Sequence, residues 1–210
     1  MSGHSEKFRA SAADLLRFVD ENPLAWVVSL SGSEFASTLL PLRPVVDAAG
    51  QITELRGHFA RTNAHVETIR GQGRAVALFL GPHGYVSPSW MSDRTQAPTW
   101  VYTSAQFDLD ISLLEEDVAR DDTLRDLVHA MEQTRPAAWS LEEMGSRYRR
   151  LASGVVAFRA RVIAQRSKFK LGQDERDDVF RDITSALDAS GARELLEWMQ
   201  RCNHRMPGAG

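Results

Sequence analysis

The chain has 210 residues, and 43% of them are hydrophobic, which is enough for one well-buried core and predicts a single domain over residues 1–210. The formal net charge is −3, so the composition disfavours a dedicated nucleic-acid-binding protein. No apolar run is long enough to cross a bilayer, and the first residues lack an apolar signal core, so we expect a cytoplasmic protein that does not bind membranes.

The first part of the chain predicts two helices and a series of short strands. Ser11 and Asp14 are typical of a helix start, and apolar residues at helical spacing follow until Asn22 and Pro23 end the helix. Apolar and alternating runs predict strands at residues 24–30, 36–46, 52–58 and 74–80, with prolines in the second that favour an edge or a bulge. Asn63 can cap a short helix that continues to about residue 72.

The second part mixes strands with longer helices. Residues 81–100 are rich in glycine, proline and aromatic residues and predict an irregular loop, followed by a strand at 101–111. A helix is expected over 112–134, and Ser140 with Glu143 forms a capping box for another helix to about residue 151. An alternating strand at 154–166 precedes a helical region over 174–201, broken near Gly191, and a disordered tail at 206–210.

These elements predict a mainly β fold with peripheral helices, of the α+β class. About six strands with few two-residue hairpins favour a small antiparallel barrel, decorated by helices over about 112–151 and 174–201. The one cysteine, Cys202, allows neither an internal disulfide nor a cysteine metal cluster.

Four segments resemble a known family: ASTLLPL at 36–42, RGHFARTNAHV at 56–66, FLGPHGYVSPSW at 79–90 with PTWVY at 98–102, and the late strand leading into SKFKLGQD at 167–174. In order and spacing, from about residue 24 to 180, they resemble the PaiB-like branch of the FMN-binding split-barrel proteins. The resemblance implies a split β-barrel that works as a homodimer, with a cofactor between the subunits. PaiB-like proteins are usually described as FMN-binding and sometimes as negative transcriptional regulators.

Arg56, His58, Arg61 and Asn63 lie around a predicted strand-to-helix junction. A helix N-terminus offers free N–H groups and a partial positive charge, so it suits an anion, and a nearby arginine strengthens the site. In related split barrels this junction binds the flavin phosphate, and it would equally suit a haem propionate or a substrate carboxylate. The residues alone also fit an alternative in which both arginines are solvated surface charges.

Lysines and aromatic side chains form a second candidate site. Lys168 and Lys170 are two residues apart and therefore share one face of a strand, where the resemblance implies contact with an anion of the cofactor or substrate. Flat side chains in or beside the long loop could stack on a planar ring, or could pack in the core and in a dimer interface. They are Tyr85, Trp90, Trp100 and Tyr102.

The chain departs from the PaiB-like pattern at informative positions. PaiB-like chains tend to carry Asn-Pro-Gln-Trp after the junction, where this chain has Asn63, Ala64, His65 and Val66. They also tend to have Trp-Asn-Tyr and a following Val-His, which here read Trp-Val-Tyr at 100–102 and Gln-Phe at 106–107. The lost amide and imidazole disfavour the usual handling of flavin, and His65 is a new imidazole in the first turn of a helix expected to line the cofactor site.

On these departures the chain resembles the haem-dependent piperazate synthases, a subgroup similar to PaiB. The resemblance implies haem b with His65 as the axial ligand of the iron, although a lone histidine on a helix is more often a surface or core residue. His58 and His83 are competing ligands, and either could instead hydrogen-bond a propionate or the backbone. It implies a lyase-like dehydration that closes L-N5-hydroxyornithine through an N–N bond. Iron would act as a Lewis acid on the hydroxyl group, and a base would deprotonate the α-amine. Candidate bases are Tyr102, His58 and Glu54, and candidate cations for the carboxylate are Arg56, Arg61 and Lys168.

Three other functions remain open. An FMN-binding oxidoreductase or flavin-carrying sensor would hold the phosphate through Arg61, Asn63 and Lys170. A DNA-binding regulator is disfavoured because the chain lacks a basic stripe and a clear helix-turn-helix. Haem storage or breakdown, known among split-barrel relatives, would share the haem and consume it when supplied with reductant and oxygen.

Overall fold

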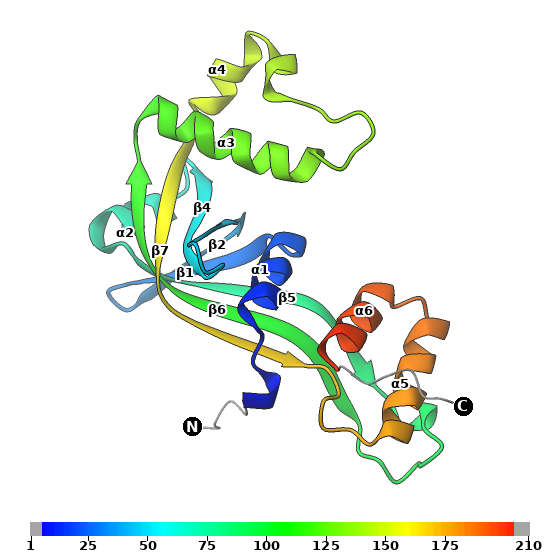
Figure 1. Cartoon of the computed structure of the whole chain (residues 1–210). Coiled ribbons are helices and arrows are strands. Elements are labelled where there is room, and N and C mark those ends of the chain that lie inside the picture. Colours follow the sequence, from blue (N-terminus) through cyan, green and yellow to red (C-terminus); the bar gives the residue numbers. More distant parts are fainter. Residues whose placement is uncertain (1–5, 204–210) are drawn as a thin grey trace. The chain divides into compact units, whose positions relative to one another are not determined.

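The structure, a computed structural model, describes residues 6–203, so the predicted disordered tail at 206–210 lies outside the described residues (Figure 1). The described chain divides into two compact units. Unit 1 contains residues 6–11, 80–105 and 166–203, and unit 2 contains residues 12–79 and 106–165. The single domain predicted from length stays a prediction.

Seven strands form one sheet in the order β2-β1-β5-β6-β7-β4-β3. Strand β1 pairs antiparallel with β2 and with β5, and β4 pairs antiparallel with β3 and with β7. The strands are β1 (Leu24–Ser31), β2 (Glu34–Pro41), β3 (Arg43–Val46), β4 (Ile52–Ala60), β5 (Arg74–Val86), β6 (Thr99–Leu114) and β7 (Val155–Lys170). The predicted class, a mainly antiparallel β fold with peripheral helices, is therefore confirmed.

The core of unit 2 is built from aromatic rings on different elements. Phe18 of α1 (Ala12–Glu21) meets Phe79 of β5 at 6.4 Å between ring centroids, and Phe79 meets Phe107 of β6 at 5.5 Å. Phe59 of β4 meets Phe158 of β7 at 4.9 Å. All five rings are buried, and such pairs stabilise the core beyond the burial of their apolar area.

Two further helical segments complete unit 2. Helix α2 (His65–Gln72) follows β4, while α3 (Asp117–Glu132) follows β6 and leads to the 3-10 turn η3 (Leu141–Met144) and α4 (Arg147–Ala152). The predicted capping box is present, since the Ser140 N–H donates to the Glu143 side chain over 3.0 Å.

Unit 1 contains the last residues of β5 and β7 and the first residues of β6. It also contains two C-terminal helices, α5 (Asp177–Ala189) and α6 (Arg193–Cys202), coloured orange to red in Figure 1. Phe169 of β7 packs edge-to-face on Trp198 of α6 with ring centroids 5.3 Å apart. The unit also contains the 3-10 turns η1 (Glu6–Phe8) and η2 (Pro88–Trp90).

Most predicted elements are present, and several boundaries were wrong. The helix expected from Ser140 to about residue 151 is the 3-10 turn η3 followed by α4, and the strand expected at 154–166 runs to Lys170. The strand expected over 36–46 is two strands, β2 and β3, which raises the strand number to seven. Residues 81–86 continue β5, so the irregular segment is shorter than predicted. Residues 112–114 extend β6, so the helix expected from 112 begins only at Asp117. Pairing with neighbouring strands, which no local pattern reveals, keeps these glycine-containing and polar ends extended.

Gly73 ends α2 in the left-handed backbone conformation, which residues other than glycine avoid. Its φ is +67°, and an added Cβ would lie 2.9 Å from the backbone oxygen of Ile111. Gly73→Ala should therefore destabilise the fold by about 1–3 kcal/mol, measured as a lower urea midpoint. Gly71→Ala, in the same helix with nothing within 4 Å of its Cβ, is the matched control and should be neutral or stabilising. An equal loss in both variants would contradict this account.

Candidate functional site

His65 lies at the start of α2 in a closed polar network within unit 2. Its side chain is only 3% exposed, and its backbone N–H donates to Asn63 Oδ1 over 2.9 Å. Ring Nδ1 lies 2.9 Å from Thr38 Oγ1, and ring Nε2 lies 2.9 Å from Ser29 Oγ. Asn63 Nδ2 in turn donates to Thr38 Oγ1 over 3.1 Å. A hydroxyl can donate or accept, so both ring nitrogens are satisfied in either tautomer.

The network explains the predicted role of Asn63 and the environment of His65. The N-cap residue of α2 is Ala64 rather than the predicted Asn63, whose carboxamide oxygen nevertheless accepts the N–H of His65 in the first turn. The His65 ring lies 5.3 Å from Phe59, a core residue of β4. Burial lowers the pKa of His65 below its usual 6.5, so the imidazole is neutral at pH 7.

Glu54, Arg56 and His58 share the other face of β4, because alternate residues of a strand point to opposite sides and Phe59 points to the core. Arg56 Nε donates to Glu54 Oε1 over 2.7 Å. His58 Nδ1 is buried without a hydrogen-bond partner among the described residues, and burial lowers the pKa of this histidine. Within unit 2 these three predicted site residues are together, while His65 contacts the opposite face of the strand.

Arg61 is occupied by contacts within the fold. Nε donates to the carbonyl of Ser153 over 3.2 Å, and Nη2 donates to the carbonyl of Val155 over 3.1 Å. Nη1 forms an ion pair with Glu115 at 3.3 Å, and Arg70 binds the same carboxylate at 2.7 Å. Arg61 thus ties the end of β4 to the start of β7, and three of its five N–H donors are engaged within the fold.

Unit 1 contains a second cluster, here called the aromatic–lysine face: His83 and Tyr85 of β5, Trp100 and Tyr102 of β6, and Lys168 of β7. The Trp100 ring lies 5.9 Å from Tyr85, edge-to-face, and 6.4 Å from His83. Lys168 Nζ lies 5.7 Å from the centroid of the Tyr102 ring. These contacts leave a partly exposed aromatic surface beside a cation.

The neighbours of this face fix its orientation. Gly84 and Val101 lie between its residues along β5 and β6, and a Cβ on Gly84 would meet Leu195 of α6 at 2.9 Å. Val101 is buried, so within unit 1 the alternate side chains pack inward. Lys170, predicted to act with Lys168, donates instead to the hydroxyl of Thr99. Trp90 ends η2 with its ring partly exposed.

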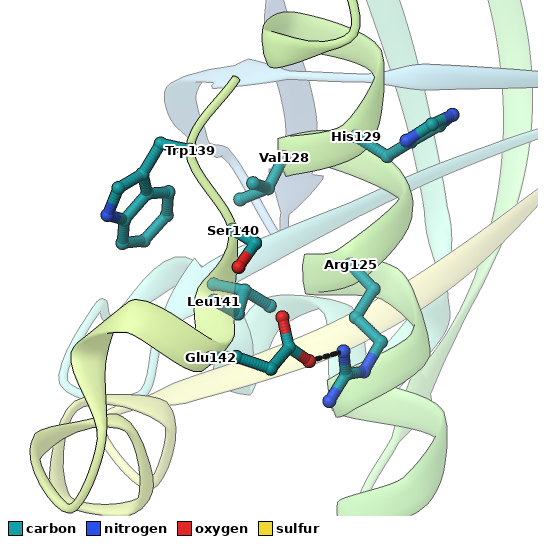
Figure 2. A pocket seen from close by; sticks show the side chains of 7 residues that line it. All are labelled: Arg125, Val128, His129, Trp139, Ser140, Leu141 and Glu142. Atoms are coloured by element: carbon teal, nitrogen blue, oxygen red, sulfur yellow. Dashed lines mark hydrogen bonds and ion pairs between the residues drawn. The ribbon is translucent and has the colours of Figure 1, made fainter. Parts of the chain in front are cut away.

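A pocket of about 270 Å³ lies elsewhere in unit 2, between α3 and the segment that opens η3 (Figure 2). Arg125 and Glu142 form an ion pair beside it, and the hydrogen bond from Arg125 lowers the pKa of the Glu142 carboxyl. None of the residues predicted for the site lines this pocket, which is formed by Arg125, Val128, His129, Trp139, Ser140, Leu141 and Glu142.

Burial lowers the pKa of both His58 and His65 from 6.5, and this predicts how stability depends on pH. As the pH falls through 6.5, the native state takes up fewer protons at these two side chains than the unfolded chain does. The free energy of unfolding should therefore fall as the pH drops from about 7 to about 5. Urea midpoints across this range should show a shallower fall for His58→Gln than for the wild type. The exposed His129→Gln is the control and should keep the wild-type slope.

Two features of the described residues limit the site further. No group of three or more histidine, cysteine, aspartate or glutamate side chains is arranged to hold a metal ion within residues 6–203. Within the same range, no helix combines the length and the apolar character needed to cross a membrane.

Sequence reasoning identified His65, Asn63 and the aromatic–lysine residues, and it missed the partners that define their roles. Ser29 belonged to no motif, and Thr38 belonged to the ASTLLPL segment without being given a role. Both hydroxyls meet His65 because β1 and β2 pair beside α2. His83 was predicted as a competing iron ligand or as a side chain that hydrogen-bonds a propionate or the backbone, and its Nδ1 lies 2.9 Å from the carbonyl oxygen of Gly81.

Comparison with known proteins places these features in a family. "Protease synthase and sporulation protein PAI 2" of Bacillus subtilis (strain 168) is 26% identical over 197 residues, which cover 90% of this chain and 92% of that protein.

Among solved structures, the FAD and heme binding protein of Mycobacterium smegmatis matches with a TM-score of 0.59 at 19% identity, over 85% of this chain and 80% of that one. The flavocytochrome Anf3 of Azotobacter vinelandii matches with a TM-score of 0.59 at 11% identity, over 82% and 73%.

These neighbours share the split-barrel fold with the seven-stranded sheet described above. A family model matches residues 4–164, more than half of the chain. The chain therefore belongs to the family described as "Putative FMN-binding domain".

Proposed function

We propose that this protein is a haem-dependent enzyme that closes L-N5-hydroxyornithine to piperazic acid with the loss of water. The observation that carries the proposal is the buried, neutral imidazole of His65 at the start of α2, where FMN-binding PaiB-like chains tend to carry other residues. Two structural relatives are named for heme or as a flavocytochrome, so haem is compatible with this fold.

His65 meets some of the requirements of an axial ligand. Iron binds a neutral imidazole, and burial keeps this ring neutral at pH 7. Ligating histidines usually hold their other ring nitrogen in a hydrogen bond, and the Thr38 hydroxyl at Nδ1 supplies one. The Ser29 hydroxyl occupies the remaining nitrogen, so coordination through Nε2 requires His65 to give up that contact.

The chain's own residues would bind and orient the substrate. Among the three cations predicted for its carboxylate, Arg56 is paired with Glu54, and Arg61 is engaged by two carbonyls and Glu115. Lys168, which belongs to unit 1, has no carboxylate partner among the described residues, so its charge is available to a carboxylate. A bound haem would supply a Lewis acid that polarises the N–O bond, and a curled substrate would gain the proximity that the free amino acid lacks.

We also propose that the protein acts as a homodimer. Trp26 of β1 is flanked by Leu39 of β2 and Leu78 of β5 in direct cross-strand register, and the three side chains are 50%, 43% and 41% exposed. Large apolar side chains in one exposed row mark an interaction surface. A second copy of the chain is the occupant that this proposal assigns to it.

An FMN-binding oxidoreductase or regulator is the second candidate, and the family match favours it. An FMN-binding protein with this structure would have to bind the phosphate with part of the Arg61 guanidinium already engaged, because Nε and Nη2 donate to the carbonyls of Ser153 and Val155. Asn63 is likewise engaged by His65 and Thr38, which leaves Lys170 as the remaining predicted phosphate ligand.

The first experiment is the absorption spectrum of protein expressed with a haem precursor. An intense Soret band that shifts with dithionite is expected, followed by conversion of N5-hydroxyornithine to a product one water lighter by mass. A two-band flavin spectrum that bleaches on reduction would replace the proposal with the FMN function. Loss of the Soret band with reductant and oxygen, without cyclisation, would indicate haem breakdown instead.

A further inference from the structure

The pocket of Figure 2 is a hollow between one face of α3 and the segment that follows this helix. Arg125, Val128 and His129 are three and four residues apart, so they share one face of α3. Trp139 and Leu141 line the pocket from the other side. All of these residues belong to unit 2, so the pocket is formed within one compact unit.

Two contacts hold the walls of the pocket together. The backbone N–H of Trp139 donates to Oε2 of Glu132, which lies one turn beyond Val128 on α3, over 3.2 Å. One turn before Val128, Arg125 forms an ion pair with Glu142, drawn as a dashed line in Figure 2. The segment is therefore attached to α3 on both sides of Val128, and the hollow between the two attachments is already formed before a ligand enters.

The lining combines an apolar wall with one charge of each sign. Val128, Leu141 and the Trp139 ring form the apolar part, and Trp139 is 38% exposed although it is a large apolar side chain. The side chains of Arg125 and Glu142 are 54% and 60% exposed. Water screens an ion pair that is this exposed, so the pair contributes little to stability. Each partner can therefore accept an opposite charge from a ligand without a large loss.

We propose that this pocket binds a free amino acid with a large apolar side chain. Such a molecule is a zwitterion at pH 7, so its carboxylate would pair with Arg125 and its ammonium group with Glu142. Its side chain would lie against Trp139, Val128 and Leu141, where apolar burial supplies affinity. The volume of about 270 Å³ is just below the range of about 300–1,000 Å³ for pockets that hold drug-sized ligands, which suits a smaller molecule. The proposal does not rest on the reaction proposed above, because no residue of the pocket was given a role in that reaction.

The test is isothermal titration of the purified protein with L-phenylalanine at pH 7. We expect saturable binding at one site per chain, and Arg125→Gln, Glu142→Gln and Trp139→Ala should each weaken it at least about tenfold. The three replaced side chains are exposed, so the variants should keep urea midpoints close to that of the wild type. Arg159→Gln, which removes the same charge from an exposed arginine of β7, is the matched control and should bind with wild-type affinity.

A second ligand, 3-phenylpropanoate, has the same ring and carboxylate but no ammonium group. It should bind the wild type more weakly than L-phenylalanine, because it competes with Glu142 for Arg125 and offers that carboxylate nothing in return. In Glu142→Gln the competitor is gone, so the order should reverse and 3-phenylpropanoate should bind more tightly than L-phenylalanine. No saturable binding to the wild type, unchanged affinity in Arg125→Gln or Glu142→Gln, or the same order of the two ligands in wild type and Glu142→Gln would each overturn the proposal, whatever the protein does with N5-hydroxyornithine.

Discussion

His65→Ala should abolish both haem binding and turnover. The substitution removes the proposed axial ligand, and it leaves the hydroxyls of Ser29 and Thr38 beside a buried cavity. Lost packing and unpaired hydroxyls should also lower the free energy of unfolding by about 2–4 kcal/mol. The measurement is the haem-to-protein ratio from the Soret band, with product formation followed by mass.

Ser29→Ala separates ligation from stability. It removes the hydroxyl that holds His65 Nε2, keeps the imidazole, and deletes only a small buried group. If His65 binds iron through Nε2, this variant should keep its haem at a wild-type ratio or bind it more tightly. A folded His65→Ala protein that retains haem and activity would reject His65 as the ligand. His65→Gln, which keeps an amide in the network, serves the same comparison if His65→Ala does not fold.

The sequence predicted elements whose signals are local. Asn22 and Pro23 end α1 at Glu21 as expected, and Gly191, with a φ of +76°, separates α5 from α6. Proline in β3 was read as an edge signal, and β3 is an edge of the sheet. Each of these features depends on the backbone preference of one or two residues, which is visible without knowing the fold.

Features that depend on long-range contacts were not predictable in the same way. Arg61 was expected to bind an anion, but its guanidinium donates to the carbonyl oxygens of Ser153 and Val155. These residues lie more than 90 positions away in the sequence, so no local pattern reveals the contacts. His65 and His58 are seven residues apart, yet they lie on opposite sides of β4, because Phe59 fixes which face is the core. The residue types indicated which side chains could take part in catalysis or binding. The pairing of strands that are distant in the sequence determined which of these side chains are in contact.

Trp26→Glu should convert the proposed homodimer into a monomer. The strip that includes Trp26, Leu39 and Leu78 lies on the outer face of β1, β2 and β5, opposite the face where Thr38 and Ser29 meet His65. In a symmetric dimer that associates through this strip, a carboxylate at its centre would be buried without a partner, and its desolvation would be costly. In a monomer the same side chain is solvated, so the fold itself should be little affected.

Sedimentation equilibrium of wild type and variant at matched concentration is the direct measurement, and Val118→Glu is the control. Val118 is 71% exposed on α3, away from the strip, so the same change of charge there should leave the association unchanged. A monomeric wild type, or a Trp26→Glu protein that still sediments as a dimer, would remove the strip as the interface. If haem is lost together with the dimer while Ser29→Ala keeps it, the cofactor site depends on the second copy.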